Sequence, residues 1–200
     1  MREWYHSPMR RSQNKLRARG TRLSRSMICL PLFLALSSSV NAQTETPQHL
    51  SDSAREFAQE FYSWYVPIAL NESDVNASDF ALMKRGSAFS PELLQALRED
   101  SAARAKSREI VGLDFDPFLA SQDPDDRYEV GKVTVKGESY WIEVYGVRAG
   151  KRRERPAVLA ELVREDGHLI FVNFHYPDPN GNDLLSILKR LRGDRQRFAR

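Results

Sequence analysis

Cysteine is almost absent from this chain of 200 residues, and Cys29 is its only example. Any product that begins after residue 42 therefore carries no thiol. This excludes disulfide bonds, thiolate metal sites and a cysteine nucleophile in such a product. Its stability must come from its core, which a domain of about 150 residues is large enough to supply.

Long hydrophobic runs are also absent. The longest, Met27–Leu36, has 10 residues, whereas a membrane-spanning helix needs about 20. It follows a basic segment, and it is followed by Val40 and Ala42, which place small side chains where signal peptidase requires them. We therefore predict a cleavable secretory signal over residues 1–42 and a periplasmic or secreted product without a transmembrane segment.

The net positive charge of the chain, +3, belongs to this predicted signal. Residues 43–200 contain 22 basic and 26 acidic residues, which gives them a net charge of −4. A basic nucleic-acid-binding protein is therefore not indicated, and export argues against such a partner as well. Signatures for catalysis, metal binding and cofactors are missing too: the chain has no His-x-x-x-His and no serine in a nucleophile-elbow context. We predict no cofactor and no catalytic residue.

The rest of the chain predicts a single α+β domain over residues 51–192, between a flexible segment at 43–50 and a basic tail at 193–200. Helices are expected from Ser51–Ser53 to Ile68 and from Ser90 to Lys106, and a last one follows Asn182. The first has an aromatic face, which we interpret as core. Four segments of β-branched and aromatic residues predict a curved antiparallel sheet with helices on one face: 128–136, 140–147, 157–164 and 169–176. A β-bulge is expected near Gly131, where the apolar parity changes.

An acidic segment between the helices and the strands is the most distinctive part of the sequence. It contains Asp114-x-Asp116-Pro-Phe followed by Ser-Gln122-Asp123. Together with Phe61-Tyr-Ser-Trp-Tyr65 and Val172-Asn-Phe-His-Tyr176, it resembles the YbjP/YqhG-type domain-of-unknown-function family of bacterial envelope proteins. The resemblance covers about Ser51 to Leu191. It implies a fold similar to the cystatin and nuclear transport factor 2-like rolls, and it implies no established activity.

Two interpretations of the acidic segment compete. Asp114 and Asp116 are candidate calcium ligands, but Phe118 and Leu119 occupy positions where a calcium loop needs a ligand and a glycine. Aspartates beside a proline more often accept hydrogen bonds from backbone amides. We therefore interpret Asp114, Asp116, Gln122 and Asp123 as a structural motif without a metal.

Two further features bear on function. A basic hairpin tip supplies the candidate binding residues Arg148, Lys151, Arg152, Arg153 and Arg155. It is either a solvated turn or a contact for an anionic surface or an acidic envelope protein. Separately, Glu143, Asn173 and His175 are expected on strands, where they could share a face with Trp141 and Tyr145. The sequence thus favours a non-enzymatic binding or accessory module, with a small-molecule pocket enzyme as the alternative.

Overall fold

The computed structural model describes residues 47–71, 76–107, 112–177 and 181–198. The predicted signal over residues 1–42 lies outside the described residues. The helices run over α1 (Pro47–Ala69), α2 (Ala77–Lys84), α3 (Pro91–Lys106) and α4 (Leu184–Phe198), with a short 3-10 turn at Gly86–Ala88. The strands are β1 (Arg127–Lys136), β2 (Ser139–Arg148), β3 (Lys151–Arg152), β4 (Val158–Glu165) and β5 (His168–His175). The predicted α+β class is confirmed.

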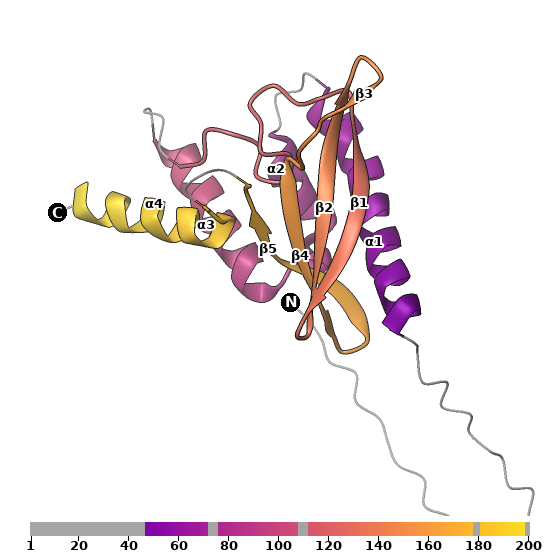
Figure 1. Cartoon of the computed structure of the whole chain (residues 1–200). Coiled ribbons are helices and arrows are strands. Elements are labelled where there is room, and N and C mark those ends of the chain that lie inside the picture. The colour runs from indigo at the N-terminus through magenta and orange to yellow at the C-terminus, as the bar shows by residue number, and fades with distance from the viewer. Residues whose placement is uncertain (1–46, 72–75, 108–111, 178–180, 199–200) are drawn as a thin grey trace, which may run out of the picture. The chain divides into compact units, whose positions relative to one another are not determined.

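The sheet is an antiparallel meander in the order β1-β2-β4-β5, and the two-residue β3 pairs with β2 (Figure 1). The sequence predicts four of these strands and misses β3, which is too short to show a periodic pattern. The pairing of β1 with β2 shifts between Val130 and Val133, which is the bulge expected near Gly131. Asp166 and Gly167 both have positive φ, as a tight hairpin turn between β4 and β5 requires.

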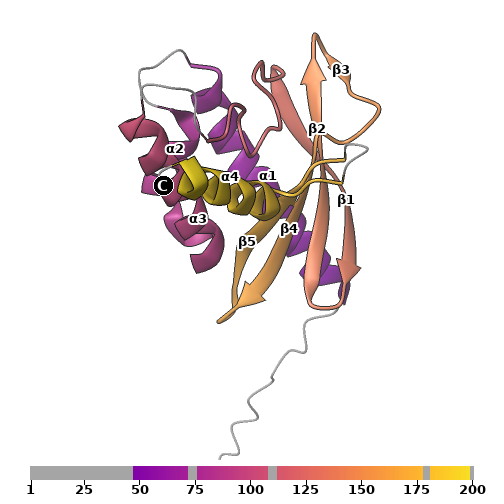
Figure 2. The ribbon, with the colours of Figure 1, turned by 90° about the vertical axis from the view of Figure 1, so that its left-hand side faces the viewer.

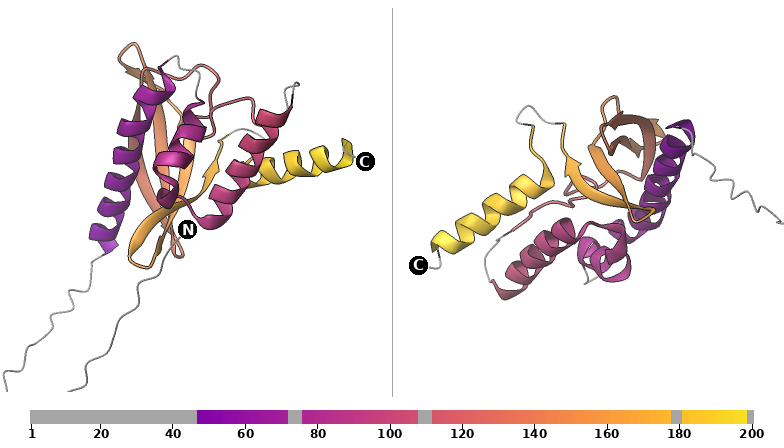
Figure 3. Two further views of the ribbon diagram at one scale, coloured as in Figure 1. Left: turned by 180° about the vertical axis from the view of Figure 1, so that it is seen from behind. Right: turned by 90° about the horizontal axis from the view of Figure 1, so that it is seen from below.

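The helices cover one face of the sheet. In Figure 1 the strands β1, β2 and β4 lie in front of α1 and α2, and the view from behind in Figure 3 shows α1 and α2 in front of the strands. In Figure 2, α3 and α4 lie side by side at the β5 end of the sheet. Among the described residues, no helix crosses the opposite face of β2 and β4.

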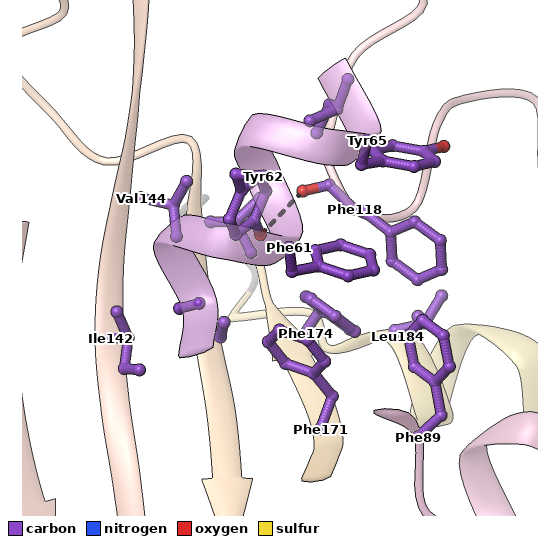
Figure 4. Close-up of a cluster of buried hydrophobic side chains, with 14 of the residues drawn as sticks. Phe61, Tyr62, Tyr65, Phe89, Phe118, Ile142, Val144, Phe171, Phe174 and Leu184 are labelled. Atoms are coloured by element: carbon purple, nitrogen blue, oxygen red, sulfur yellow. Dashed lines mark hydrogen bonds between the residues drawn. The ribbon is translucent and has the colours of Figure 1, made fainter. Parts of the chain in front are cut away.

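The core between α1 and the sheet is aromatic (Figure 4). Phe61 is 1% exposed, and its ring lies 4.9 Å from that of Phe171 and 5.5 Å from that of Phe118. Phe118 comes from the acidic segment, so this loop contributes directly to the core. Tyr65, one turn after Phe61 on α1, is also buried. The predicted aromatic face of the first helix therefore packs inward, and a fully buried aromatic side chain stabilises a fold by about 2–3 kcal/mol.

Both ends of the domain are more ordered than the sequence predicts. Helix α1 begins at Pro47, inside the predicted flexible segment 43–50. Ser53, where the helix was expected to begin, consequently lies within it and donates to the carbonyl of His49 at 2.9 Å. At the other end, α4 continues through the predicted tail to Phe198. Arg195 on α4 reaches the buried carboxylate of Asp100 on α3 at 2.7 Å, which holds the end of the chain in place.

Candidate functional site

The turn Asp116–Leu119 is fixed to the core by tyrosine side chains. The hydroxyl of Tyr62 donates to the carbonyl of Phe118 at 3.0 Å (Figure 4). Three more hydroxyl groups donate to the turn: Tyr65, also on α1, to the carboxylate of Asp116 at 2.5 Å, Tyr176 to the carbonyl of Pro117 at 2.9 Å, and Tyr128 to the carbonyl of Leu119 at 3.4 Å. These bonds satisfy backbone carbonyls that would otherwise be buried without a partner. The turn is therefore a rigid part of the core.

The carboxylate of Asp116 is enclosed by this turn. One of its oxygens accepts from the backbone amides of Phe118 and Leu119 at 2.9 and 3.1 Å, and the other accepts from Tyr65. Loss of water around the carboxylate raises its pKa to about 6, although the hydrogen bonds favour the charged form. Burial raises the pKa of the Tyr65 hydroxyl well above its usual range, so this group remains a donor at neutral pH.

A second aspartate, Asp125, joins the same loop to the basic hairpin. Arg153 binds its carboxylate through Nε and Nη2 at 2.9 and 2.7 Å, and Nε of Arg148 lies 2.8 Å from it. The hydrogen bond from Arg153 is the main reason why the pKa of Asp125 lies below its usual value. Gly146 on β2 makes room for this arrangement, because a Cβ at this position would collide with the carboxylate of Asp125.

Tyr128 connects the two aspartate sites. Its hydroxyl donates to the carbonyl of Leu119 and accepts from the backbone amide of Asp125, in each case at 3.4 Å. The acidic loop and the hairpin therefore form one continuous surface at one end of the sheet (Figure 1). We call residues 113–126 together with residues 148–155 the loop–hairpin surface.

The predicted binding residues fall into two groups. Arg148 and Arg153 are committed to ion pairs within the domain, since Arg148 also binds the carboxylate of Asp123 at 2.9 Å. The acidic loop therefore offsets the charge of these two arginines, and the binding role of the five residues stays a prediction. Lys151, Arg152 and Arg155 are exposed. The guanidinium of Arg152 lies 3.7 Å from the centre of the Tyr145 ring.

The predicted acidic motif is divided in the same way. Asp116 holds the two backbone amides, and Asp123 pairs with Arg148. Asp114 and Gln122 are exposed, and the side-chain amide of Gln122 lies 3.4 Å from the carboxylate of Asp114. Asp114 thus lies on the solvent side of a loop whose interior is held by Asp116.

The uncovered face of the sheet carries the residues of the enzyme alternative. The strand register pairs Trp141 with Glu161. It also places Glu143 on β2 and His175 on β5 opposite the same residue of β4, so that these two residues lie in line across the sheet. His175 Nε2 lies 2.8 Å from a carboxylate oxygen of Glu161, and its ring stacks on Trp141 with centroids 4.1 Å apart. Tyr145 donates to Glu143 at 2.9 Å.

Asn173 has a structural role on this face. Its side-chain amide donates to Asp183 at 2.8 Å, and its carbonyl oxygen accepts from the backbone amide of Leu185 at 3.2 Å. These bonds fix the start of α4 beside β5. The sequence predicts that Glu143, Asn173 and His175 share a face, but it misses Glu161, because the pairing of β4 with β5 that brings Glu161 to His175 has no local signal.

The described residues contain no group of three or more acidic, histidine or cysteine side chains arranged to hold a metal ion. Within the same residues, no helix is both long and apolar enough to cross a membrane.

Comparison with known proteins gives little further information. No family model matches the chain, and no curated protein matches it. One chain of the type VI native effector-immunity complex Tae3-Tai3 from Ralstonia pickettii is similar, with a TM-score of 0.44 and 21% identity. The match covers 62% of this chain and 94% of that chain. We draw no inference about function from so remote a likeness.

Proposed function

We propose that this chain is an exported protein of the bacterial envelope, of the YbjP/YqhG type, and that it works by binding a partner rather than by catalysis. The loop–hairpin surface is the proposed contact. The observation that carries the proposal is the way in which this surface is built: Asp116 fixes the loop to the core, and Asp125 fixes the hairpin to the loop.

Such a surface is suited to recognition because it is ordered before a partner arrives. Binding normally costs free energy when loops and side chains become ordered, and a pre-organised surface avoids much of that cost. The exposed charges of Lys151, Arg155 and Asp114 then remain available to an incoming partner. Charges of this kind contribute mainly to the rate and the orientation of association.

Export and family membership are the parts of the proposal that rest on the sequence. The predicted signal and the small residues Val40 and Ala42 support cleavage before Gln43. The intact mass of the protein recovered from the periplasm tests this step. A mature species that keeps Met27–Leu36 would contradict it.

Cross-linking in living cells tests the binding role. A photoreactive amino acid is placed at Lys151 in the full-length chain, and at Arg190 on α4 as a control. We expect a discrete cross-linked product from position 151 and none from 190. In the chain labelled at position 151, R155E should weaken that product without changing the melting temperature, because the side chain of Arg155 is exposed. Reversal of Arg153 is avoided, since it would break the ion pair with Asp125. A folded R155E variant that cross-links from position 151 as strongly as the unchanged chain would count against the loop–hairpin surface.

The pocket enzyme remains a second candidate because of one observation, the pair formed by His175 and Glu161. A carboxylate that orients a histidine is a common arrangement in general acid–base catalysis. A hollow beside β4 and β5 is lined by Glu161 and Asn173, together with the start of α3, but not by His175. If a folded His175→Ala variant lost all function in cells while K151E/R155E kept it, the enzyme would become the better explanation.

A further inference from the structure

A hollow between the acidic loop and the hairpin is lined by an excess of positive charge. Five cationic side chains contribute to it: Arg148, Lys151, Arg152, Arg153 and Arg155. Three acidic side chains, Asp123, Asp125 and Glu154, also line it, which leaves a net charge of +2. Every residue that lines the hollow belongs to the described part of the chain.

The ion pairs and backbone contacts use all three nitrogens of Arg148 but leave donors on the other cations. Asp125 binds Nε and Nη2 of Arg153, and the described residues provide no partner for its Nη1. Arg152 lies on the face of Tyr145 and also forms a side-chain hydrogen bond with it, which leaves part of the guanidinium edge to donate. For Lys151 and Arg155, the described residues supply no ion pair. Several donors therefore surround one hollow, and part of the set is fixed in advance.

We propose that this hollow binds a phosphate-bearing ligand, specifically a phosphomonoester group. Such a group carries a charge of about −1.5 to −2 at pH 7 and offers three strong acceptor oxygens. This charge matches the excess of +2 in the lining. Guanidinium and ammonium groups are strong donors to phosphate oxygens, and Lys151 and Arg155 have no ion pair among the described residues, whereas Arg148 and Arg153 are held on the acidic loop.

This inference rests on the proposed function, because it names the chemistry that the loop–hairpin surface would recognise. A carboxylate-rich protein segment is the competing ligand. It is less well matched, since each carboxylate brings a single charge with two oxygens, whereas the hollow gathers its cations around one place.

Binding measurements with defined probes test the inference. The exported protein is titrated with inorganic phosphate, and it is sedimented with phosphatidylcholine vesicles that contain phosphatidic acid, which has a phosphomonoester headgroup. The variant K151Q/R155Q removes two cations of the hollow. The matched control K189Q/R190Q removes the same charges from exposed positions on α4. Melting temperatures verify that both variants fold.

We expect binding of at least one probe to weaken roughly tenfold in K151Q/R155Q, which corresponds to about 1.4 kcal/mol, and to stay unchanged in the control. Binding of both probes indicates recognition of the phosphate group itself. Binding of the vesicles alone indicates a lipid source, and binding of inorganic phosphate alone indicates a soluble one.

Three results would overturn the inference. The first is that neither probe binds. The second is that both variants lose binding equally, because such a loss would reflect only the general charge of the protein. The third is that polyglutamate, titrated as a further probe, binds while the phosphate probes do not, which would point to an acidic protein segment. The cross-link from position 151 tests the proposed binding function independently. A negative result for phosphate therefore contradicts only the phosphate site and leaves the binding function to be judged by that cross-link.

Discussion

Asp116 and Asp125 belong to the same loop, yet their surroundings move their pKa values in opposite directions. Asp116 is enclosed by neutral donors, two backbone amides and the hydroxyl of Tyr65, and its pKa is raised to about 6. Asp125 is only 7% exposed as a residue, but it lies directly beneath Arg148 and Arg153, whose side chains are 41% and 53% exposed. The hydrogen bond from Arg153 and the positive charges of both arginines lower its pKa, although burial acts in the opposite direction.

The difference shows that burial and charge pairing act in opposite directions on a carboxylate: burial raises the pKa of Asp116, and pairing with arginine lowers the pKa of Asp125. Neutral donors satisfy the oxygens of Asp116 but replace only part of the solvation that an ion loses. Two arginines supply a full compensating charge to Asp125. The first site accordingly serves the core, and the second joins two surface segments.

The largest expected effect comes from removing the anchor of the inner turn. Phe118→Ala should lower the free energy of unfolding by about 3–5 kcal/mol, because the ring is fully buried among other aromatic rings. Denaturant unfolding measures this loss. Phe115→Ala in the same loop is the control, and it should cost clearly less, since Phe115 is only partly buried. Equal losses would mean that the turn is not specially anchored.

The pH dependence of stability should separate the two aspartates. Because the pKa of folded Asp116 is raised from 3.8 to about 6, its contribution is fully present below about pH 4 and is lost as the pH rises through 6. The loss amounts to at most about 3 kcal/mol. Asp125 acts in the opposite sense: its contribution is present above about pH 4 and disappears as the pH falls through its lowered pKa.

The variant D116N isolates the first of these terms. It keeps the shape and an acceptor for the amides, but it cannot titrate. We expect it to be less stable than the wild type at pH 4.5 and equally or more stable at about pH 7.5, so that the two stability curves cross. Denaturation at a series of pH values measures them. Parallel curves would show that Asp116 titrates normally.

The next effect concerns the outer site. Gly146→Ala should destabilise the domain by about 2 kcal/mol, because the new Cβ displaces the carboxylate of Asp125 from its arginines. Asp125→Ala should cost a similar amount. The double variant should cost less than the sum, since the methyl group no longer meets a carboxylate. Strict additivity of the two changes would contradict the predicted collision.

The sequence predicts the general architecture well, because helices, hairpins and the bulge near Gly131 have local signals. It predicts less of the loop–hairpin surface. The acidic and basic segments are visible as charge, but their mutual neutralisation depends on β2 returning beside residues 123–126, which is a tertiary event. A glycine inside a strand often marks a place where another group lies close to the backbone. Gly146 was therefore the one sequence signal that a side chain such as Asp125 packs against this point of β2. Helix α1 begins earlier and helix α4 ends later than the sequence predicts. For α4 the reason is the ion pair between Arg195 and Asp100, which is a tertiary contact without a local signal.

The smallest expected effect concerns Asp114, which the sequence groups with Asp116. In the structure the backbone amides of the turn donate to Asp116. Asp114 is exposed, and its carboxylate lies 3.4 Å from the side-chain amide of Gln122. Asp114→Ala should therefore change the free energy of unfolding by less than about 0.5 kcal/mol, as is usual for exposed positions.

Asp116→Ala provides the contrast, because it leaves two amides and the Tyr65 hydroxyl without their acceptor and should cost more than about 1 kcal/mol. Denaturant unfolding of both variants, with and without calcium, makes the comparison. If Asp114→Ala cost as much as Asp116→Ala, or if calcium stabilised the wild type but neither variant, then the two aspartates would act together as ligands, and the division of the loop into an inner and an outer side would be wrong.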